Sequence, residues 1–231
     1  MEKRYVSALI LAAGVGSRMH SETTKQQIEI LGKSVLERAV QIYETASLVN
    51  EIVIVVKEDE IDFANSIACK YPKVKNVIMG GKVRAESAKI GFESICKTAD
   101  FVAIHDAARC LTLPSDVDAV INDAFRFGAA TASSAVTDTV KEVGEEGFIK
   151  FTHSRKTMRF VQTPQVFSCE LYKKALEAID IFDERITDDN FLLENISCPV
   201  FCTETGKDNI KITTPEDILY ADFLLRGERN E

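Results

Sequence analysis

The chain has 231 residues, of which 45% are hydrophobic and 28% are charged. This composition is typical of a folded globular protein and excludes long disordered, collagen-like and coiled-coil sequences. The formal net charge of −8 disfavours polyanionic partners such as nucleic acid and anionic membrane surfaces, while it is compatible with a local basic pocket for a small phosphate compound.

Length and cysteine usage predict one cytoplasmic domain. A chain of this size fits a single α/β domain over residues 1–231. No apolar run approaches the roughly 20 residues of a membrane span, so we expect no membrane partner. The apolar run Val6–Ala13 is followed by glycines and an arginine, which disfavours an export signal. The six cysteines form neither a Cys-x-x-Cys pair nor a zinc pattern, and reduced thiols in the cytoplasm are the expectation.

Strand-like and helical patterns alternate through residues 6–136. Continuous apolar runs are typical of strands buried on both faces of a largely parallel sheet. The predicted strands are Val6–Leu11, Ile52–Val56, Val74–Met79, Phe101–Ile104 and Ala129–Val136, with helical spacing near 34–47, 58–70, 84–97 and 115–127. This alternation predicts a doubly wound α/β fold with helices on both faces of the sheet. Because such sheets bind ligands at the carboxyl ends of their strands, the segments that follow the strands are the candidates for function.

The alternation stops between Thr137 and Phe160. The turn sequence Gly144–Gly147 separates Thr139–Val143 from Phe148–His153, which predicts a projecting β-hairpin. After the hairpin we expect a strand, two helices, a further strand and a final helix. Their ranges are Val161–Phe167, 169–180, 187–195, 199–203 and the residues from Pro215 onward.

The segment Leu11–Met19, directly after the first predicted strand, is rich in small residues. Glycines let backbone N–H groups close around phosphate oxygens, and alanines leave room for a flat base. The small residues of this predicted phosphate-binding loop are Ala12, Ala13, Gly14 and Gly16. Two alternatives stay open. One is a plain turn between strand and helix, and the other is a dinucleotide-binding loop, which is disfavoured because Met19 stands where a third small residue is expected.

Charged residues follow this loop and the later strands. Arg18 and Lys25 lie beside the glycines, where two cations would neutralise charge on a phosphoryl group in transfer, or would simply be solvated. Asp106 and Arg109 follow the fourth strand, where a carboxylate can hold Mg²⁺ and an arginine can fork onto a phosphate, unless the two form a plain ion pair. Lys211 lies in a strand-like segment and either extends into the site or snorkels at an edge.

Weaker patterns complete the set of candidates. Gly81 and Ser87 follow the third strand and suit a close backbone approach with a hydroxyl hydrogen bond, although a simple turn would have the same sequence. Thr187 precedes two aspartates that are also explained by helix capping. We interpret His105 as a packed residue at a strand end, without a catalytic role.

Together these segments resemble one family, the 2-C-methyl-D-erythritol 4-phosphate cytidylyltransferases of the non-mevalonate isoprenoid pathway. Glycine loops alone are shared by many sugar-nucleotide transferases, whereas the ordered series is far more specific. The matching segments are Ala12–Met19, Lys25–Gln26, Gly80–Gly81 with Arg84 and Ser87, His105–Arg109, Asp138–Lys141, Arg155, Gln162–Gln165, Thr187–Asp189, Asn209–Lys211 and Pro215–Asp217.

The resemblance implies a Rossmann-like nucleotidyltransferase fold and a homodimer in which residues 137–160 form a dimerisation β-arm that extends into the partner's site. It implies CTP and the methylerythritol phosphate as substrates, with Mg²⁺ at Asp106. The CTP side would comprise Ala12, Ala13, Gly14, Gly16, Arg18, Lys25, Gly81 and Ser87. The acceptor side would comprise Asp106, Arg109, Thr139 and Thr187, with Arg155 and Thr163 from the partner chain and Lys211 between the two ligands. The catalytic residues would be Arg18, Lys25, Arg155 and Lys211.

This reaction needs no enzyme nucleophile or general base, because a sugar-phosphate oxygen is already anionic at neutral pH. The nearest alternative is a CDP-ribitol-forming cytidylyltransferase, which would share the fold and the nucleotide side. The aspartates after Thr187 and the alanines before Arg109 favour the erythritol substrate. An NAD-dependent oxidoreductase and a non-catalytic CTP sensor are more distant alternatives.

The chain departs from the family pattern at three positions. Thr24 and Cys110 stand where proline is usual, and Arg159 stands near a position that often holds an aromatic residue. Thr24 predicts a less stiff loop before Lys25, and Arg159 leaves the packing of the arm open. Cys110 follows Arg109, and a thiol near cations is expected to have a lowered pKa and a raised reactivity.

Overall fold

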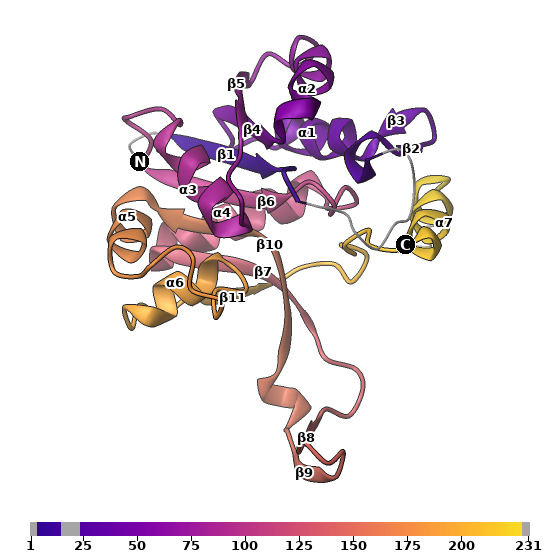
Figure 1. The fold of residues 1–231 in the computed structure, drawn as a ribbon, viewed down its shortest axis with the longest axis vertical. Coiled ribbons are helices and arrows are strands. Elements are labelled where there is room, and N and C mark those ends of the chain that lie inside the picture. The colour runs from indigo at the N-terminus through magenta and orange to yellow at the C-terminus, as the bar shows by residue number, and fades with distance from the viewer. Residues whose placement is uncertain (1–3, 15–23, 228–231) are drawn as a thin grey trace.

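A seven-stranded sheet forms the centre of the computed structural model (Figure 1), which describes residues 4–14 and 24–227. The strand order is β11-β7-β10-β6-β1-β4-β5. These strands span Val6–Leu11 (β1), Glu51–Val56 (β4), Val74–Met79 (β5), Phe101–Asp106 (β6), Ala129–Ala135 (β7), Arg159–Ser168 (β10) and Phe201–Glu204 (β11). β10 runs antiparallel to β6 and β7, and the other neighbours are parallel. The predicted, mostly parallel α/β sheet is therefore confirmed.

Helices cover both faces of this sheet. One face packs against α1, α2 and α4, and the other packs against α3, α5 and α6. These helices span Val35–Thr45 (α1), Ile61–Ala68 (α2), Arg84–Glu93 (α3), Pro114–Phe127 (α4), Cys169–Glu177 (α5) and Asp189–Asn195 (α6). In β1, Ala8 and Ile10 join the first core while Leu9 and Leu11 join the second. Continuous apolar strands arise here because alternate side chains enter two different cores.

Two short segments differ from the predicted elements. A small hairpin of β2 (Glu29–Ile30) and β3 (Lys33–Ser34) lies between β1 and α1 in the sequence, and its turn residues have positive φ angles. Residues 209–213, predicted as a strand-like segment, form no strand. Ile210 and Ile212 pack instead into a third core beside the last helix, α7 (Pro215–Leu225), so an extended loop with alternating burial resembled a strand in sequence.

Residues 137–160 leave the domain between β7 and β10 as a projecting arm (Figure 1). Its hairpin consists of β8 (Lys141–Val143) and β9 (Ile149–Thr152), followed by the short 3-10 helix η3 (Arg155–Thr157). Phe148, Ile149 and Phe151 are more than half exposed. The predicted hairpin is confirmed, and its apolar side chains have no core within the described chain.

Two further observations concern the helices. A capping box of Thr214 and Asp217 with Pro215 at the first turn starts α7, which agrees with the predicted helix start. No helix among residues 4–14 and 24–227 is both long and apolar enough to cross a membrane.

Candidate active site

The carboxyl ends of β1, β5 and β6 border a cavity of about 310 Å³. Its lining residues are Leu11, Ala13, Gly14, Lys25, Gln26, Gly81, Lys82, Val83, Arg84, Ser87, Asp106, Ala108, Lys211 and Thr213. Four of them are cationic, namely Lys25, Lys82, Arg84 and Lys211, and one, Asp106, carries a carboxylate. The acidic protein thus has a local basic pocket at the edge of the sheet where a ligand was expected.

The loops after β1 and β5 approach each other closely at the cavity. A side chain at Gly80 would place its Cβ 2.8 Å from the Cβ of Ala13 and 2.8 Å from the Oγ of Ser87. The backbone N–H of Gly81 donates to that Oγ (3.0 Å). Glycine is required here because the loop after β1 and the loop after β5 share one narrow space. Of the predicted phosphate-binding loop, Gly16 and Arg18 lie outside the described residues.

Lys25 and Gln26 begin a short 3-10 helix, η1 (Lys25–Gln27), that borders the cavity. The side-chain amide of buried Gln26 donates to the carbonyl oxygen of Ala12 (2.7 Å). The hydroxyl of Thr24 donates to Glu60 (2.5 Å), which belongs to the 3-10 helix η2 (Glu58–Glu60). Two side-chain bonds therefore hold this segment against the residue that follows β1 and against η2. Thr24 thus tethers the segment that was expected to be less stiff without a proline.

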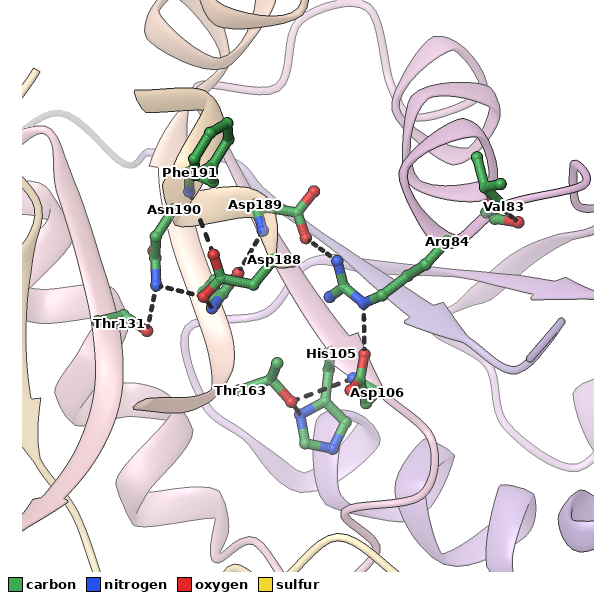
Figure 2. A network of polar contacts seen from close by, with 12 residues as sticks. Val83, Arg84, His105, Asp106, Thr131, Thr163, Asp188, Asp189, Asn190 and Phe191 are labelled. Carbon is green, nitrogen blue, oxygen red and sulfur yellow. Dashed lines mark hydrogen bonds and ion pairs between the residues drawn. The ribbon is translucent and has the colours of Figure 1, made fainter. Parts of the chain in front are cut away.

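Charges of alternating sign run from α6 to the cavity (Figure 2). The carboxylate of Asp189, 1% exposed, accepts from Arg84 (2.6 Å) and from the hydroxyl of Tyr172 (2.6 Å). Arg84 also pairs with Asp106 (3.0 Å), whose other oxygen accepts from Lys211 (2.6 Å). Burial alone would raise the pKa of Asp106, but the charges of Arg84 and Lys211 outweigh it and hold that pKa well below its usual range.

Behind Asp106 lies a buried polar cluster. The hydroxyl of Thr163 accepts from the backbone N–H of Asp106 (3.1 Å) and contacts Nδ1 of His105 (3.0 Å; Figure 2). Thr163 therefore belongs to its own chain's site, and the expectation that the partner supplies it is wrong: as a residue of a central strand, it is buried beside Asp106. Burial lowers the pKa of His105 to about 3, which is consistent with a packed, neutral ring and no acid–base role. Arg109 donates to the carbonyl oxygen of Asn209 (2.8 Å), and burial lowers the pKa of its guanidinium.

The remaining predicted residues lie away from this cavity. Thr139 and Arg155 are exposed on the arm, where Arg155 donates to the carbonyl oxygen of Thr137. Thr187 is exposed just before α6, whose N-cap Asp188 accepts from the backbone N–H of Phe191 (3.1 Å). A single chain therefore gathers the cavity residues but does not bring the arm residues to them.

A family model described as 2-C-methyl-D-erythritol 4-phosphate cytidylyltransferase matches residues 6–227. The chain belongs to this family. Relatives of that name from Clostridium botulinum and Pelotomaculum thermopropionicum are each 35% identical, over 221 and 227 residues. The alignments cover 95% and 97% of this chain and 96% and 95% of the relatives. A crystal structure of 4-diphosphocytidyl-2C-methyl-D-erythritol synthase from Anaerococcus prevotii has a TM-score of 0.87, is 29% identical and covers 97% of both chains.

The structure gives a role to two residues that belong to the matched segments of the cytidylyltransferase family but had no role predicted from the sequence. Arg84 was part of the matched motif, and it joins Asp106 to Asp189. Gln26, also part of the motif, fixes the loop after β1. The positions of Arg84 and Gln26 within matched segments pointed to a function for both. The sequence could not show what that function was, because their bonding partners are far away in the sequence.

The expectation for Cys110 is wrong. Cys110 is 3% exposed, and burial raises the pKa of its thiol to about 11 although Arg38 and Lys25 act in the opposite direction. Desolvation of the thiolate outweighs these charges because the side chain packs in the third core with Leu111 and Ile212. A buried, protonated thiol replaces the predicted reactive one.

The donor set of the cavity fits Mg²⁺ as an ion carried by nucleotide phosphates. Within the described residues no group of three His, Cys, Asp or Glu side chains could hold a metal. Mg²⁺ at phosphate sites is commonly held by one or two carboxylates together with substrate phosphates and water. Asp106 lines the cavity and its lowered pKa keeps it ionised, so it offers one such carboxylate.

Proposed function

We propose that this chain transfers the cytidylyl group of CTP to 2-C-methyl-D-erythritol 4-phosphate, which yields 4-diphosphocytidyl-2-C-methyl-D-erythritol and pyrophosphate for isoprenoid precursor biosynthesis. The observation that carries the proposal is the basic cavity in a member of this family. Four cationic side chains and one carboxylate line this cavity at the carboxyl edge of the sheet, which suits two polyanionic substrates held side by side.

In the reaction, an oxygen of the acceptor phosphate forms a bond to the α-phosphorus of CTP while the bond to pyrophosphate breaks. The phosphate is already anionic, so no residue removes a proton, and neutral His105 has no part in the transfer. The protein has to hold two anions that repel each other and neutralise the charge that leaves. Lys25 and Lys211 border the cavity from different segments and are assigned this role, together with Arg18.

On the CTP side, the proposal assigns the base and the phosphates to the loops after β1 and β5. These loops contribute Ala12, Ala13, Gly14, Gly16, Gly81 and Ser87. On the acceptor side, it assigns Asp106, Arg109 and Thr187 from the same chain, while Thr163 holds the backbone of Asp106. Mg²⁺ would be held by Asp106 and the phosphates, where it would withdraw charge from the reacting phosphoryl group.

The arm is assigned to a homodimer. Exposed Phe148, Ile149 and Phe151 favour burial against a second copy of the chain, since a two-stranded ribbon is marginally stable alone. Arm exchange would bring Arg155 to the partner's acceptor side. Thr139, which was expected among its own chain's acceptor residues, lies on the same arm and would be carried to the partner with it. We also place the enzyme in the cytoplasm, where CTP is available and where its six free cysteines would stay reduced.

A pyrophosphate-release assay tests the function. The purified chain is incubated with CTP and Mg²⁺ and, in parallel, with 2-C-methyl-D-erythritol 4-phosphate, ribitol 5-phosphate or no acceptor. We expect pyrophosphate release only in the reaction that contains 2-C-methyl-D-erythritol 4-phosphate. Preference for ribitol 5-phosphate would make the chain a CDP-ribitol-forming enzyme, and CTP binding without release under any condition would make it a nucleotide sensor.

A further inference from the structure

Four hydrogen bonds close a ring behind the cavity, at the end of β6. His105 Nε2 lies 3.3 Å from the carbonyl oxygen of Arg109, and Arg109 Nη1 lies 2.8 Å from the carbonyl oxygen of Asn209. Asn209 Nδ2 lies 2.9 Å from the carbonyl oxygen of Thr163, and Thr163 Oγ1 lies 3.0 Å from His105 Nδ1. The ring joins β6, β10 and the loop before α7, which are distant in sequence.

Only one assignment of protons satisfies the whole ring. A carbonyl oxygen can only accept, so Nε2 of His105 carries the hydrogen that faces Arg109. In a neutral imidazole the other nitrogen, Nδ1, must then accept, and the hydroxyl hydrogen of Thr163 points to it. The oxygen of that hydroxyl accepts from the backbone N–H of Asp106. The hydroxyl of Thr163 thus has no hydrogen left for a substrate.

The ring fixes the charged groups of the acceptor side. Asp106 is held through its backbone, Arg109 is a member of the ring, and Lys211 follows Asn209 by two residues. His105 is fully buried and Asn209 is 2% exposed, so neither is placed to touch a substrate in the cavity. Buried polar groups that lose a partner stay unsatisfied, which makes such a ring rigid while it is complete.

We propose that His105 and Asn209 are positioning residues that hold Asp106, Arg109 and Lys211 in the geometry that binds the acceptor phosphate. This role rests on the proposed function, because it concerns the acceptor side of that reaction. The ring contacts neither the loop after β1 nor the loop after β5 among the bonds it makes. Damage to the ring should therefore weaken acceptor binding and spare CTP binding.

Steady-state kinetics test the proposal through the split between the two substrates. His105→Phe keeps an aromatic ring against Tyr43 but removes both bonds, Asn209→Asp replaces a donor by a repelling carboxylate, and Thr163→Val removes the hydroxyl. Each is expected to raise the KM for the acceptor about tenfold or more, the scale of one lost buried hydrogen bond, and to leave the KM for CTP within about twofold. Thr163→Ser keeps the hydroxyl, so its KM for the acceptor should stay close to the wild-type value.

A matched control separates positioning from general loss of stability. Ser133→Ala removes a buried hydroxyl in β7 that donates to the carbonyl oxygen of Thr203 (3.0 Å) and makes none of the four bonds of the ring. Its acceptor KM should equal that of the wild type. The proposal is overturned if the ring variants change both KM values alike, if they change neither, or if Ser133→Ala raises the acceptor KM as they do.

The tautomer of His105 gives a test that needs neither variants nor turnover. Long-range ¹H–¹⁵N NMR of the wild-type protein should show His105 with its proton on Nε2. A proton on Nδ1 would overturn the ring, and so the proposal, even if the variants fail to fold. If the chain forms no product but His105 has the expected tautomer, the proposed function fails while the ring stands.

Discussion

The loops around the cavity and the projecting arm hold their candidate residues in opposite ways. Asp106 and its cationic partners are held by buried bonds to several elements of one chain. Arg155 and Thr139 lie on an exposed ribbon whose apolar side chains contact no core in that chain. The comparison teaches that one chain assembles the charged cavity from its own segments, while nothing in the described chain holds the arm residues beside that cavity.

The largest expected effects come from deleting cations of the cavity. Lys25→Ala, Lys211→Ala and Arg18→Ala should lower kcat by about 10²–10³ while CTP binding changes less, because charge neutralisation matters most in the transition state. Measurement is by pyrophosphate release at saturating CTP and Mg²⁺. Lys75→Ala, which deletes an exposed lysine bonded to the carbonyl oxygen of Pro72, is the control. Near-normal turnover in any of the three cavity variants would remove that residue from the mechanism.

The arm side of the comparison is tested by subunit mixing. Arg155→Ala and Asp106→Ala homodimers should each be nearly inactive. If the arm acts across the dimer, a mixed dimer has one site with both defects and one intact site. Equal mixing gives about half mixed dimers, so about a quarter of wild-type activity should return.

Subunit exchange has to be verified with differently tagged chains that co-purify. With exchange proven, activity that stays at background would show that Arg155 serves its own chain's site or no site. That result would also remove the contrast between the arm and the cavity.

Much of the fold was predictable because strands buried on both faces give continuous apolar runs, as in β1 and β4. The direction of β10 was not predictable, since a buried antiparallel strand and a buried parallel strand have the same apolar composition. The loop at Lys211 resembled a strand because alternating isoleucines pack into one core in either conformation.

The candidate site was predictable where residues follow one strand and not where partners come from distant segments. Gly81, Ser87 and Asp106 were found because each follows a predicted strand. Arg84 and Asp189 are 105 positions apart in the sequence, and no local pattern pairs them. For the same reason the position of Thr163 in its own chain's site could not be predicted, because its partner His105 is 58 positions away in the sequence.

A smaller effect concerns the anchor of the charges behind the cavity. Tyr172→Phe removes a buried hydroxyl that donates to Asp189, and it should lower the free energy of unfolding by about 1–3 kcal/mol. Tyr43 is equally buried, but its hydroxyl has no hydrogen-bond partner among the described residues. Tyr43→Phe should therefore be neutral or slightly stabilising. Urea unfolding of both variants measures the difference, and equal losses would contradict the anchoring role of Tyr172.

The smallest effect is the slow labelling of Cys110. Its pKa of about 11 leaves about one thousandth of the thiol ionised at roughly pH 8, and only the thiolate is alkylated. Exposed Cys69 and Cys202 should react first, and labelling of Cys110 should rise about tenfold per pH unit below its pKa while the protein stays folded. Mass spectrometry after timed alkylation measures each site. Modification of Cys110 as fast as Cys202 would mean that the third core, beside Arg109, opens readily. The contrast between a packed interior next to the cavity and an exposed arm would then be one of degree.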